Sequence, residues 1–145
     1  MIMLQPVTKE NFYPCLELER EEWFFVGDAY AVLANAYLYR ESSMAYAIYL
    51  DEVIIGMVIL DEKGTEGVYE FTDLFIADDY KGKGHAAETM EAILNHFIKK
   101  GAKAVRMRVN KENAIAIHVY KKCGFEEDGE VSWNKDFLFM KKQFV

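Results

Sequence analysis

The sequence predicts an α/β domain in which one mixed β-sheet carries helices on both faces. Three observations predict this class. Runs rich in β-branched and aromatic residues recur along the chain, stretches with helical periodicity separate them, and no linker, repeat or low-complexity tract interrupts the 145 residues. This length and the 52% hydrophobic content are typical of one domain with a real core, so we expect residues 1–145 to form a single domain.

The N-terminal elements are a strand and two helices. "IMLQPV" predicts a strand over residues 2–7. The segment Thr8 to Asn11 can cap a helix that runs to about Trp23, because Pro14 is tolerated in a first turn. A second helical stretch covers residues 28–39.

Three strands and a long helix follow. "MAYAIYL" and "VIIGMVIL" predict a hairpin around residues 51–52, and "GVYEFTDLFI" predicts a third strand over residues 67–76. Residues 85–100 have helical periodicity, with Gly101 at the C-terminal stop. The apolar face of this helix is expected to contain Ala86, Met90, Ile93, Leu94 and Phe97.

The C-terminal part completes the order β-αα-βββ-α-β-α-ββ. "AVRMRV" predicts a strand, and residues 113–122 predict a short helix closed by Gly124. "GEVSW" and "FLFMKK" predict a last hairpin around residues 134–135. This order predicts one mixed sheet covered on both faces.

The charge is acidic overall but unevenly distributed. The net charge is -7; residues 51–80 hold nine acids and one base, whereas residues 81–122 hold three acids and ten bases. This asymmetry predicts either one surface for an anion and another for a cation, or solvated faces, and the acidic total argues against nucleic acid as the main partner. The sequence shows neither a signal peptide nor an apolar run long enough for a membrane span. Cys15 and Cys123 fit no metal-binding spacing, so we expect no metal. With only two cysteines and no export signal, we expect free thiols and a cytoplasmic location.

The segment "DLFIADDYKGKGHAAETM", residues 73–90, has three interpretations. Gly82-x-Gly84-x-x-Ala87 has the spacing of a dinucleotide fingerprint, but residues 77–81 separate it from the strand and no acid ends the next strand. The P-loop pattern is absent. The third interpretation is a glycine turn into a helix.

The chemistry of this segment predicts a pyrophosphate cradle. Gly82 and Gly84 have no side chains, so a ligand can approach their backbone closely. The helix that follows points free N–H groups at the same place, and its dipole favours anions. Lys81 and Lys83 add positive charge.

Two motifs resemble those of the GCN5-related N-acetyltransferase superfamily. "YKGKGHA" is similar to its acyl-CoA loop, Arg/Gln-x-x-Gly-x-Gly/Ala, with Lys81 in place of the usual Arg or Gln. "VNKENAIAIHVYKKCGF" is similar to the asparagine–tyrosine–glycine–phenylalanine segment on the penultimate helix of the family. The resemblance covers essentially the whole chain and implies the fold of that superfamily and the use of acetyl-CoA.

The resemblance implies a set of cofactor-binding residues. The strand around Phe75 would offer its backbone to the thioester arm, with the N–H of Ile76 as an oxyanion donor, and Asn113 and Tyr120 would share the helix face toward the arm. Tyr120 would protonate the leaving thiolate. Lys121 and Lys122 are expected to be solvated or to touch the 3′-phosphate. The full cofactor-binding set is Leu74, Phe75, Ile76, Lys81, Gly82, Lys83, Gly84, His85, Ala86, Ala87, Asn113 and Tyr120.

The acceptor amine must lose a proton before it can attack. Glu70 and Asp73 lie on the strand that reaches the site, and strict alternation would place them on opposite faces of the sheet. We expect Glu70 to act as the base through a water molecule, with Asp73 second and deprotonation by bulk water as the alternative.

The acceptor side is predicted from an acidic segment and from the resemblance. In this fold the first helices wall the acceptor site, and clustered carboxylates there suit a polycation, although a solvated acidic helix is the alternative. The sequence also looks like bacterial spermidine/spermine and diamine N-acetyltransferases. The acidic residues of this segment are Glu10, Glu17, Glu19, Glu21, Glu22 and Asp28. The predicted substrate-binding residues are Glu22, Trp23, Asp28, Tyr30 and Asp73.

The favoured function is therefore acetyl-CoA-dependent N-acetylation of a polyamine such as spermidine or spermine. The alternatives are acetylation of a protein N-terminus, a lysine or an aminoglycoside, and a non-catalytic acyl-CoA-binding regulatory module. The presence of both Asn113 and Tyr120 argues against the module, because a sensor needs no proton donor. The aromatic-rich final hairpin is a candidate homodimer interface.

Overall fold

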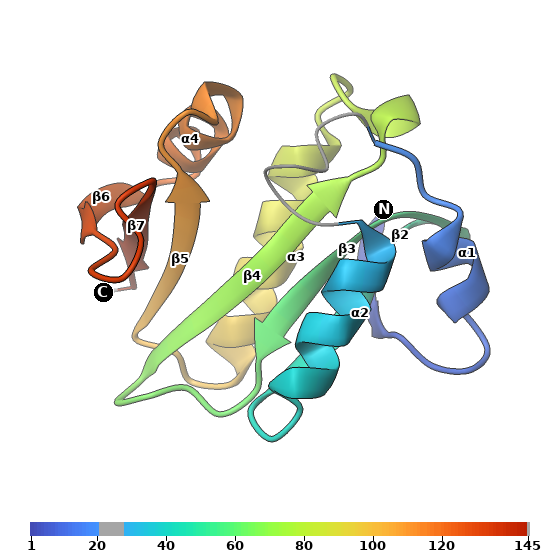
Figure 1. The fold of residues 1–145 in the computed structure, drawn as a ribbon, viewed down its shortest axis with the longest axis horizontal. Coiled ribbons are helices and arrows are strands. Elements are labelled where there is room, and N and C mark those ends of the chain that lie inside the picture. Colours follow the sequence, from blue (N-terminus) through green and yellow to red (C-terminus); the bar gives the residue numbers. More distant parts are fainter. Residues whose placement is uncertain (21–27, 145) are drawn as a thin grey trace.

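A computed structural model describes residues 1–20 and 28–144 (Figure 1). Within them, seven strands form one sheet in the order β1-β2-β3-β4-β5-β7-β6. Neighbouring strands are antiparallel except β4 and β5, which run parallel. The strands are β1 (Ile2–Pro6), β2 (Ser43–Leu50), β3 (Val53–Asp61), β4 (Val68–Ile76), β5 (Ala104–Asn110), β6 (Glu126–Glu130) and β7 (Phe137–Gln143). The predicted mixed sheet and the predicted element order are confirmed.

Helices cover both faces of this sheet, and each face has its own apolar cluster. The helices are α1 (Phe12–Leu16), α2 (Ala29–Leu38), α3 (His85–Lys99) and α4 (Ala114–Lys122), with a 3₁₀ turn η1 (Asp78–Tyr80) before α3. Ile93 and Phe97 of α3 and Tyr120 of α4 pack in the larger cluster, and Val32 of α2 packs in the smaller one. Full burial of one such apolar side chain stabilises the fold by about 1.5–3 kcal/mol. We call these the α3 face and the α2 face of the sheet.

The hydrophobic pattern of α3 predicted the buried face of that helix with one exception. Met90, Ile93, Leu94 and Phe97 are buried, whereas Ala86 is exposed and Thr89 is fully buried in its place. Ala86 lies in the first turn, beyond the part of α3 that packs on the sheet. Ala86 therefore stays exposed, next to the glycine loop that precedes α3.

Two predicted elements differ from the structure. The helix predicted to reach Trp23 ends at Leu16, because the N–H of Leu18 already bonds to the carbonyl of Cys15, a tighter turn than an α-helix; residues 21–27 lie outside the described part. Strand β6 covers residues 126–130 and not the predicted 129–133, since residues 131–136 form the turn. All five residues of β6 are exposed and none is apolar in its side chain, so no apolar alternation marked it as a strand.

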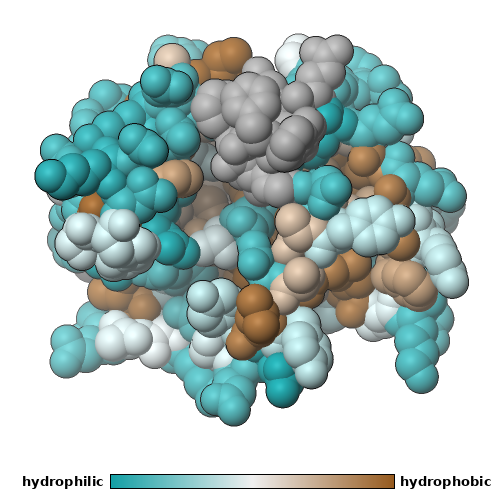
Figure 2. All heavy atoms as spheres, in the orientation of Figure 1, coloured by the Kyte–Doolittle hydropathy of each residue, from teal (hydrophilic) through white to brown (hydrophobic). Residues whose placement is uncertain are grey.

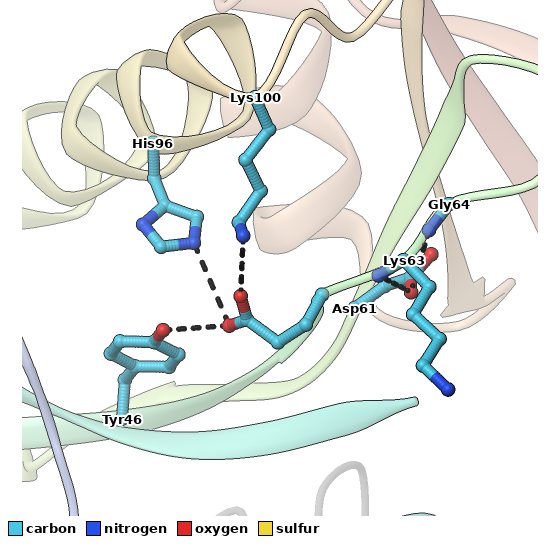
Figure 3. Close-up of polar contacts among 7 residues, drawn as sticks. Tyr46, Asp61, Lys63, Gly64, His96 and Lys100 are labelled. Atoms are coloured by element: carbon cyan, nitrogen blue, oxygen red, sulfur yellow. Dashed lines mark hydrogen bonds and ion pairs between the residues drawn. The ribbon is translucent and has the colours of Figure 1, made fainter. Parts of the chain in front are cut away.

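Three polar side chains converge on Glu62, just after β3 (Figure 3). Tyr46 of β2 donates to its Oε1 at 2.6 Å, Lys100 approaches its Oε2 at 2.8 Å, and His96 of α3 lies 3.7 Å from Oε1. Burial alone would raise the pKa of Glu62, but the hydrogen bonds from Lys100 and Tyr46 outweigh it and lower the pKa. Burial lowers the pKa of His96. This cluster ties the end of α3 to strands β2 and β3.

The hydropathy of the surface differs between the two sides of the molecule. Figure 2 shows hydrophilic side chains over α4 and the final hairpin and a more mixed surface over α2. No helix in the described residues is long and apolar enough to cross a membrane.

Candidate functional site

The central feature of the site is a split in the sheet between β4 and β5. These strands are paired at only three positions, Val68↔Ala104, Tyr69↔Val105 and Glu70↔Arg106. Beyond this last pair the two strands diverge (Figure 1), so β4 from Phe71 onward has a strand partner on one edge only, β3. Backbone groups on the facing edges are therefore free to bond an extended ligand lying between them as an additional strand.

The backbone of β4 directs alternate N–H groups into this split. The N–H of Ala77 donates to the carbonyl of Ile55 on β3 at 2.8 Å. Because backbone groups alternate along a strand, the N–H of Ile76 points to the opposite edge, toward the split. Leu74, two residues earlier, shares that direction, whereas Phe75 faces β3 opposite Met57. Of the three residues expected to offer their backbone, the geometry thus favours Leu74 and Ile76.

Tyr120 of α4 lies on the α3 face and packs against β4. Its side chain is 9% exposed, and its ring centroid lies 6.2 Å from that of Phe71 and 6.0 Å from that of Phe125. Burial, with a smaller contribution from Cys123, raises the pKa of Tyr120 above its ordinary value. The phenol therefore keeps its proton at neutral pH, as a proton donor must.

Asn113 precedes α4 and is not part of it. It is the N-cap residue, and its Oδ1 accepts a hydrogen bond from the N–H of Ala116 at 3.3 Å. The expectation that Asn113 and Tyr120 share one helix face counted Asn113 as helical, and the structure corrects this. The side chain holds the first turn of α4, and its amide N–H₂ group is the part left for a ligand.

The glycine segment forms an open loop that leads into α3. Gly82 has φ +74° and Gly84 has φ +83°, conformations that other residues rarely adopt. A Cβ atom placed on either would meet nothing within 4 Å, so the space over both backbones is open. Gly84 is the N-cap of the 15-residue helix α3, whose first N–H groups point into that space.

The side chains around this loop add charge next to the open space. Lys81 lies 3.0 Å from Asp78, Lys83 donates to the carbonyl of Asp79 at 3.1 Å, and the ring of His85 lies 3.4 Å from Glu88. Ala86 and Ala87 follow in the first turn of α3 and are exposed. The loop thus has what a pyrophosphate group requires: open backbone, a helix N-terminus and two lysines.

On the α2 face, a cavity of about 1020 Å³ extends across β4 and β5. Its floor includes Glu70, Thr72 and Asp73 from β4 and Arg106 and Arg108 from β5. The other charged or aromatic lining residues are Tyr39, Asp61, Lys63, Trp133, Phe139 and Lys141. The cavity and Tyr120 therefore lie on opposite faces of the sheet at the split.

The expectation that Glu70 and Asp73 face opposite sides of the sheet is wrong, because β4 contains a bulge. Ile59 pairs with Thr72 but Met57 pairs with Phe75, so Asp73 and Leu74 together face the single residue Val58. Asp73 has φ +55°, which costs a residue other than glycine about 1–2 kcal/mol. The extra residue reverses the alternation and places Asp73 in the same cavity as Glu70.

The two carboxylates of β4 have different surroundings. One oxygen of Glu70 accepts two hydrogen bonds from Arg106, at 2.9 Å from Nε and 2.6 Å from Nη2. Asp73 accepts one from Asn35 of α2 at 3.1 Å. Burial raises the pKa of Asp73, while Asn35 and the charge of Arg108 act in the opposite direction. Glu70 is therefore held by a cation, whereas the direct partner of Asp73 is an uncharged amide.

The acidic N-terminal segment does not line this cavity in the described residues. Asp28 caps α2 by accepting from the N–H of Ala31, and Tyr30 is 65% exposed; neither lines the cavity. The described acids Glu10, Glu17 and Glu19 are exposed and also outside its lining. Glu22 and Trp23 lie outside the described residues.

Sequence reasoning missed the cavity residues of α2, β5 and β7. Arg106 and Arg108 are two apart on a strand, a spacing that places both on one face, and this signal was available. Asn35 and Trp133 gave no signal, because only the packing of α2 and of the final hairpin brings them to β4 and β5.

Comparisons with known proteins agree with this geometry. The sequence profile of the acetyltransferase (GNAT) family matches residues 11–125. The chain is 25% identical over 140 residues to spermidine N(1)-acetyltransferase of Escherichia coli, which covers 90% of this chain and 75% of that protein. It is 26% identical over 83 residues to a spermine/spermidine N(1)-acetyltransferase of Bacillus subtilis, covering 57% of this chain and 55% of the relative.

Solved structures show the same fold at low identity. Spermidine N-acetyltransferase from Vibrio cholerae, in complex with CoA and spermine, matches with a TM-score of 0.76 at 20% identity, over 98% of this chain and 95% of that one. The aminoglycoside acetyltransferase AAC(6')-Ib with coenzyme A matches with a TM-score of 0.81 at 22% identity, over 99% and 95%. The chain therefore belongs to the acetyltransferase (GNAT) family and is an N-acetyltransferase that uses acetyl-CoA.

Proposed function

We propose that the split between β4 and β5 holds acetyl-CoA and that the cavity on the α2 face holds the acceptor, a polyamine with a primary amine. The observation that carries this proposal is that the cavity and Tyr120 meet the split from opposite faces of the sheet. An amine can thus reach the split from one face while Tyr120 serves the leaving group from the other.

Different parts of the chain bind different parts of acetyl-CoA. The open backbone at Gly82 and Gly84 and the N-terminus of α3 receive the pyrophosphate, and the edges of β4 and β5 receive the extended arm. The N–H of Ile76 donates to the oxygen on which charge develops. Acetyl-CoA supplies a thioester carbonyl, at which the amine nitrogen forms a C–N bond while the C–S bond breaks.

Two side chains handle the protons. Tyr120 donates its proton to the leaving sulfur, because burial keeps the phenol protonated. Asp73 is the better placed of the two carboxylates to take a proton from the acceptor ammonium, since Arg106 occupies one oxygen of Glu70. Glu70, first expected to be the base, then neutralises Arg106 in the floor of the cavity.

Two observations support a polyamine as the acceptor. Three carboxylates, Asp61, Glu70 and Asp73, line the cavity, and Asp61 and Asp73 can receive separate ammonium groups because Glu70 is paired with Arg106. Relatives from Escherichia coli and Bacillus subtilis carry the names of spermidine and spermine N-acetyltransferases.

A second acceptor class is favoured by the bases of the same cavity. Lys63, Arg106, Arg108 and Lys141 also line it, and among the described residues only Arg106 of these four forms a close ion pair, with Glu70. An amine that also carries a carboxylate or a phosphate would place the amine at Asp73 and the anion at Arg108. For such an acceptor the charges of the lining are complementary, whereas a polyamine has no anionic group for Lys63, Arg108 and Lys141.

A panel assay decides between these classes. The purified chain with acetyl-CoA is given spermidine, spermine, a lysine peptide, an aminoglycoside, free amino acids and phosphoethanolamine, while thiol release is followed and products are identified by mass spectrometry. Turnover with spermidine and spermine supports the polyamine proposal. Turnover only with amines that carry an anion moves the assignment to the second class, and acetyl-CoA binding without thiol release from any amine would favour a regulatory module.

The substitution Arg108→Gln sharpens the choice. Removal of this base should lower KM for a polyamine, because it removes repulsion, and should raise KM for an amine with an anionic group.

The homodimer through the final hairpin and the cytoplasmic location stay predictions. Light scattering on the purified chain tests whether it forms a dimer.

A further inference from the structure

Asn35 of α2 is the side chain that holds Asp73. Its Nδ2 donates to Oδ2 of Asp73 at 3.1 Å, and both residues line the cavity. Helix α2 packs on the sheet through its buried residues Ala29 and Val32, and the N-cap Asp28 fixes its start. The donor therefore comes from an anchored helix and not from a loop.

The bulge places the side chain of Asp73 on the α2 face but does not orient its carboxylate, and the contact with Asn35 supplies that orientation. Asp73 has a left-handed backbone conformation, and the bulge turns its side chain to the α2 face. A carboxylate can rotate about its side-chain torsions, so the backbone alone does not fix the direction of its oxygens. With Oδ2 bonded to Asn35, Oδ1 is the oxygen left for an amine in the cavity.

Several charged groups act on Asp73 from the elements packed around it. Arg108 of β5 favours the ionised carboxylate, and burial favours the neutral acid. The other charged side chains of the cavity are Asp61, Lys63, Glu70, Arg106 and Lys141. Asn35 is uncharged, so its effect on Asp73 is the effect of one hydrogen bond to the charged form. Removing the Asn35 amide should therefore make the ionised form of Asp73 less favourable relative to the neutral acid.

We propose that Asn35 is a positioning residue that orients the carboxylate of Asp73 and keeps it ionised, so that Asp73 can take a proton from the acceptor ammonium. This rests on the proposed function. The ammonium gives one proton to Asp73 and loses its second when the C–N bond has formed; Tyr120 gives one proton to the sulfur and is reprotonated. One proton is released overall, and Asp73 returns its own to water through the open cavity.

The test compares pH profiles. Asn35→Leu has nearly the same size but cannot donate, so ionised Asp73 becomes less favourable. We expect the fall in kcat/KM relative to the wild type to be at least about fivefold larger at pH 6 than at pH 9, because lost orientation acts at every pH whereas lost ionisation acts only at low pH. Asn95→Leu, at an exposed asparagine of α3, is the matched control and should leave the profile unchanged.

Each outcome decides one point. A profile of Asn35→Leu that overlays the wild type would overturn the inference while leaving the proposed function intact. A loss of equal size at every pH, with unchanged thermal stability, would also overturn it, because a role through the charge of Asp73 must depend on pH. If the wild-type chain acetylates no amine, the proposed function itself fails.

Discussion

Arg106 donates two hydrogen bonds to a single oxygen of Glu70, and this pair is the last one at which β4 and β5 are joined. The guanidinium also lies 4.3 Å from the ring centroid of Phe139, so it is held from two sides. Glu70 and Arg106 therefore close the lower end of the split and form part of the cavity floor.

The first prediction separates the two carboxylates of the cavity. Asp73→Asn should lower kcat at least about thirtyfold, because the proton acceptor is lost, whereas Glu70→Gln should change it less than about threefold. Both substitutions preserve shape, and steady-state kinetics with a saturating amine measures them. A larger loss for Glu70→Gln would return the role of base to Glu70.

The second prediction concerns Tyr120. Tyr120→Phe removes only the hydroxyl from a residue packed between Phe71 and Phe125, so the fold should persist while kcat falls roughly 10²-fold or more. KM for acetyl-CoA should change little, and circular dichroism confirms folding. An unchanged kcat would remove Tyr120 from the role of acid.

The third prediction uses glycines of equal backbone strain. Gly84→Ala should weaken CoA binding about tenfold or more, because its Cβ would enter the open space over the loop. Gly101→Ala is the matched control: Gly101 also has a positive φ and no atom within 4 Å of a Cβ, but it follows the far end of α3. Both should lose about 1 kcal/mol of stability, and only Gly84→Ala should lose affinity by isothermal titration. Equal affinities for the two variants would place the pyrophosphate elsewhere.

The fourth prediction concerns the Glu62 cluster and pH (Figure 3). The pKa of His96 is lowered in the fold, so His96 contributes stability above its ordinary value of 6.5, and this is lost as pH falls through the folded value. Glu62, whose pKa is also lowered in the fold, contributes stability above its ordinary value of 4.5, and this stability is lost as the pH falls further. The free energy of unfolding should therefore fall as pH drops below about 6.5.

His96→Phe should remove the first part of that fall, because phenylalanine keeps a ring against Tyr46 and Phe97 but cannot titrate. Urea unfolding between pH 7.5 and 4 measures it. The control is His118→Phe, at an exposed histidine of α4, which should retain the fall. If His96→Phe keeps the same pH dependence as the wild type, His96 is not the titrating group.

Elements that follow from local pattern were predicted well. Helix α3 and the β2–β3 hairpin depend on periodicity and turn chemistry, and both signals come from residues that are close together in the sequence. The bulge at Asp73 depends instead on how β4 pairs with β3, so the alternation rule gave the wrong face for this residue. The glycine loop was predicted because its chemistry is local to the segment.

Most residues of the cavity proposed for the acceptor could not be predicted, for a related reason. The carboxylates of the N-terminal segment were expected to line it, whereas the lining of the described cavity comes from one helix and five strands joined in space. Asn35 and Asp73 are 38 residues apart, and only the packing of α2 on the sheet brings them together. Which residues line such a cavity is therefore decided by tertiary packing and not by local sequence.

The split also leaves an edge strand in the middle of the molecule. Unpaired strand edges promote self-association, and β4 beyond Glu70 has such an edge. A bound acyl-CoA arm would cap this edge from within. The same ligand that the enzyme consumes would then also keep the chain dispersed, so the enzyme depleted of acyl-CoA should aggregate on heating before the loaded enzyme does.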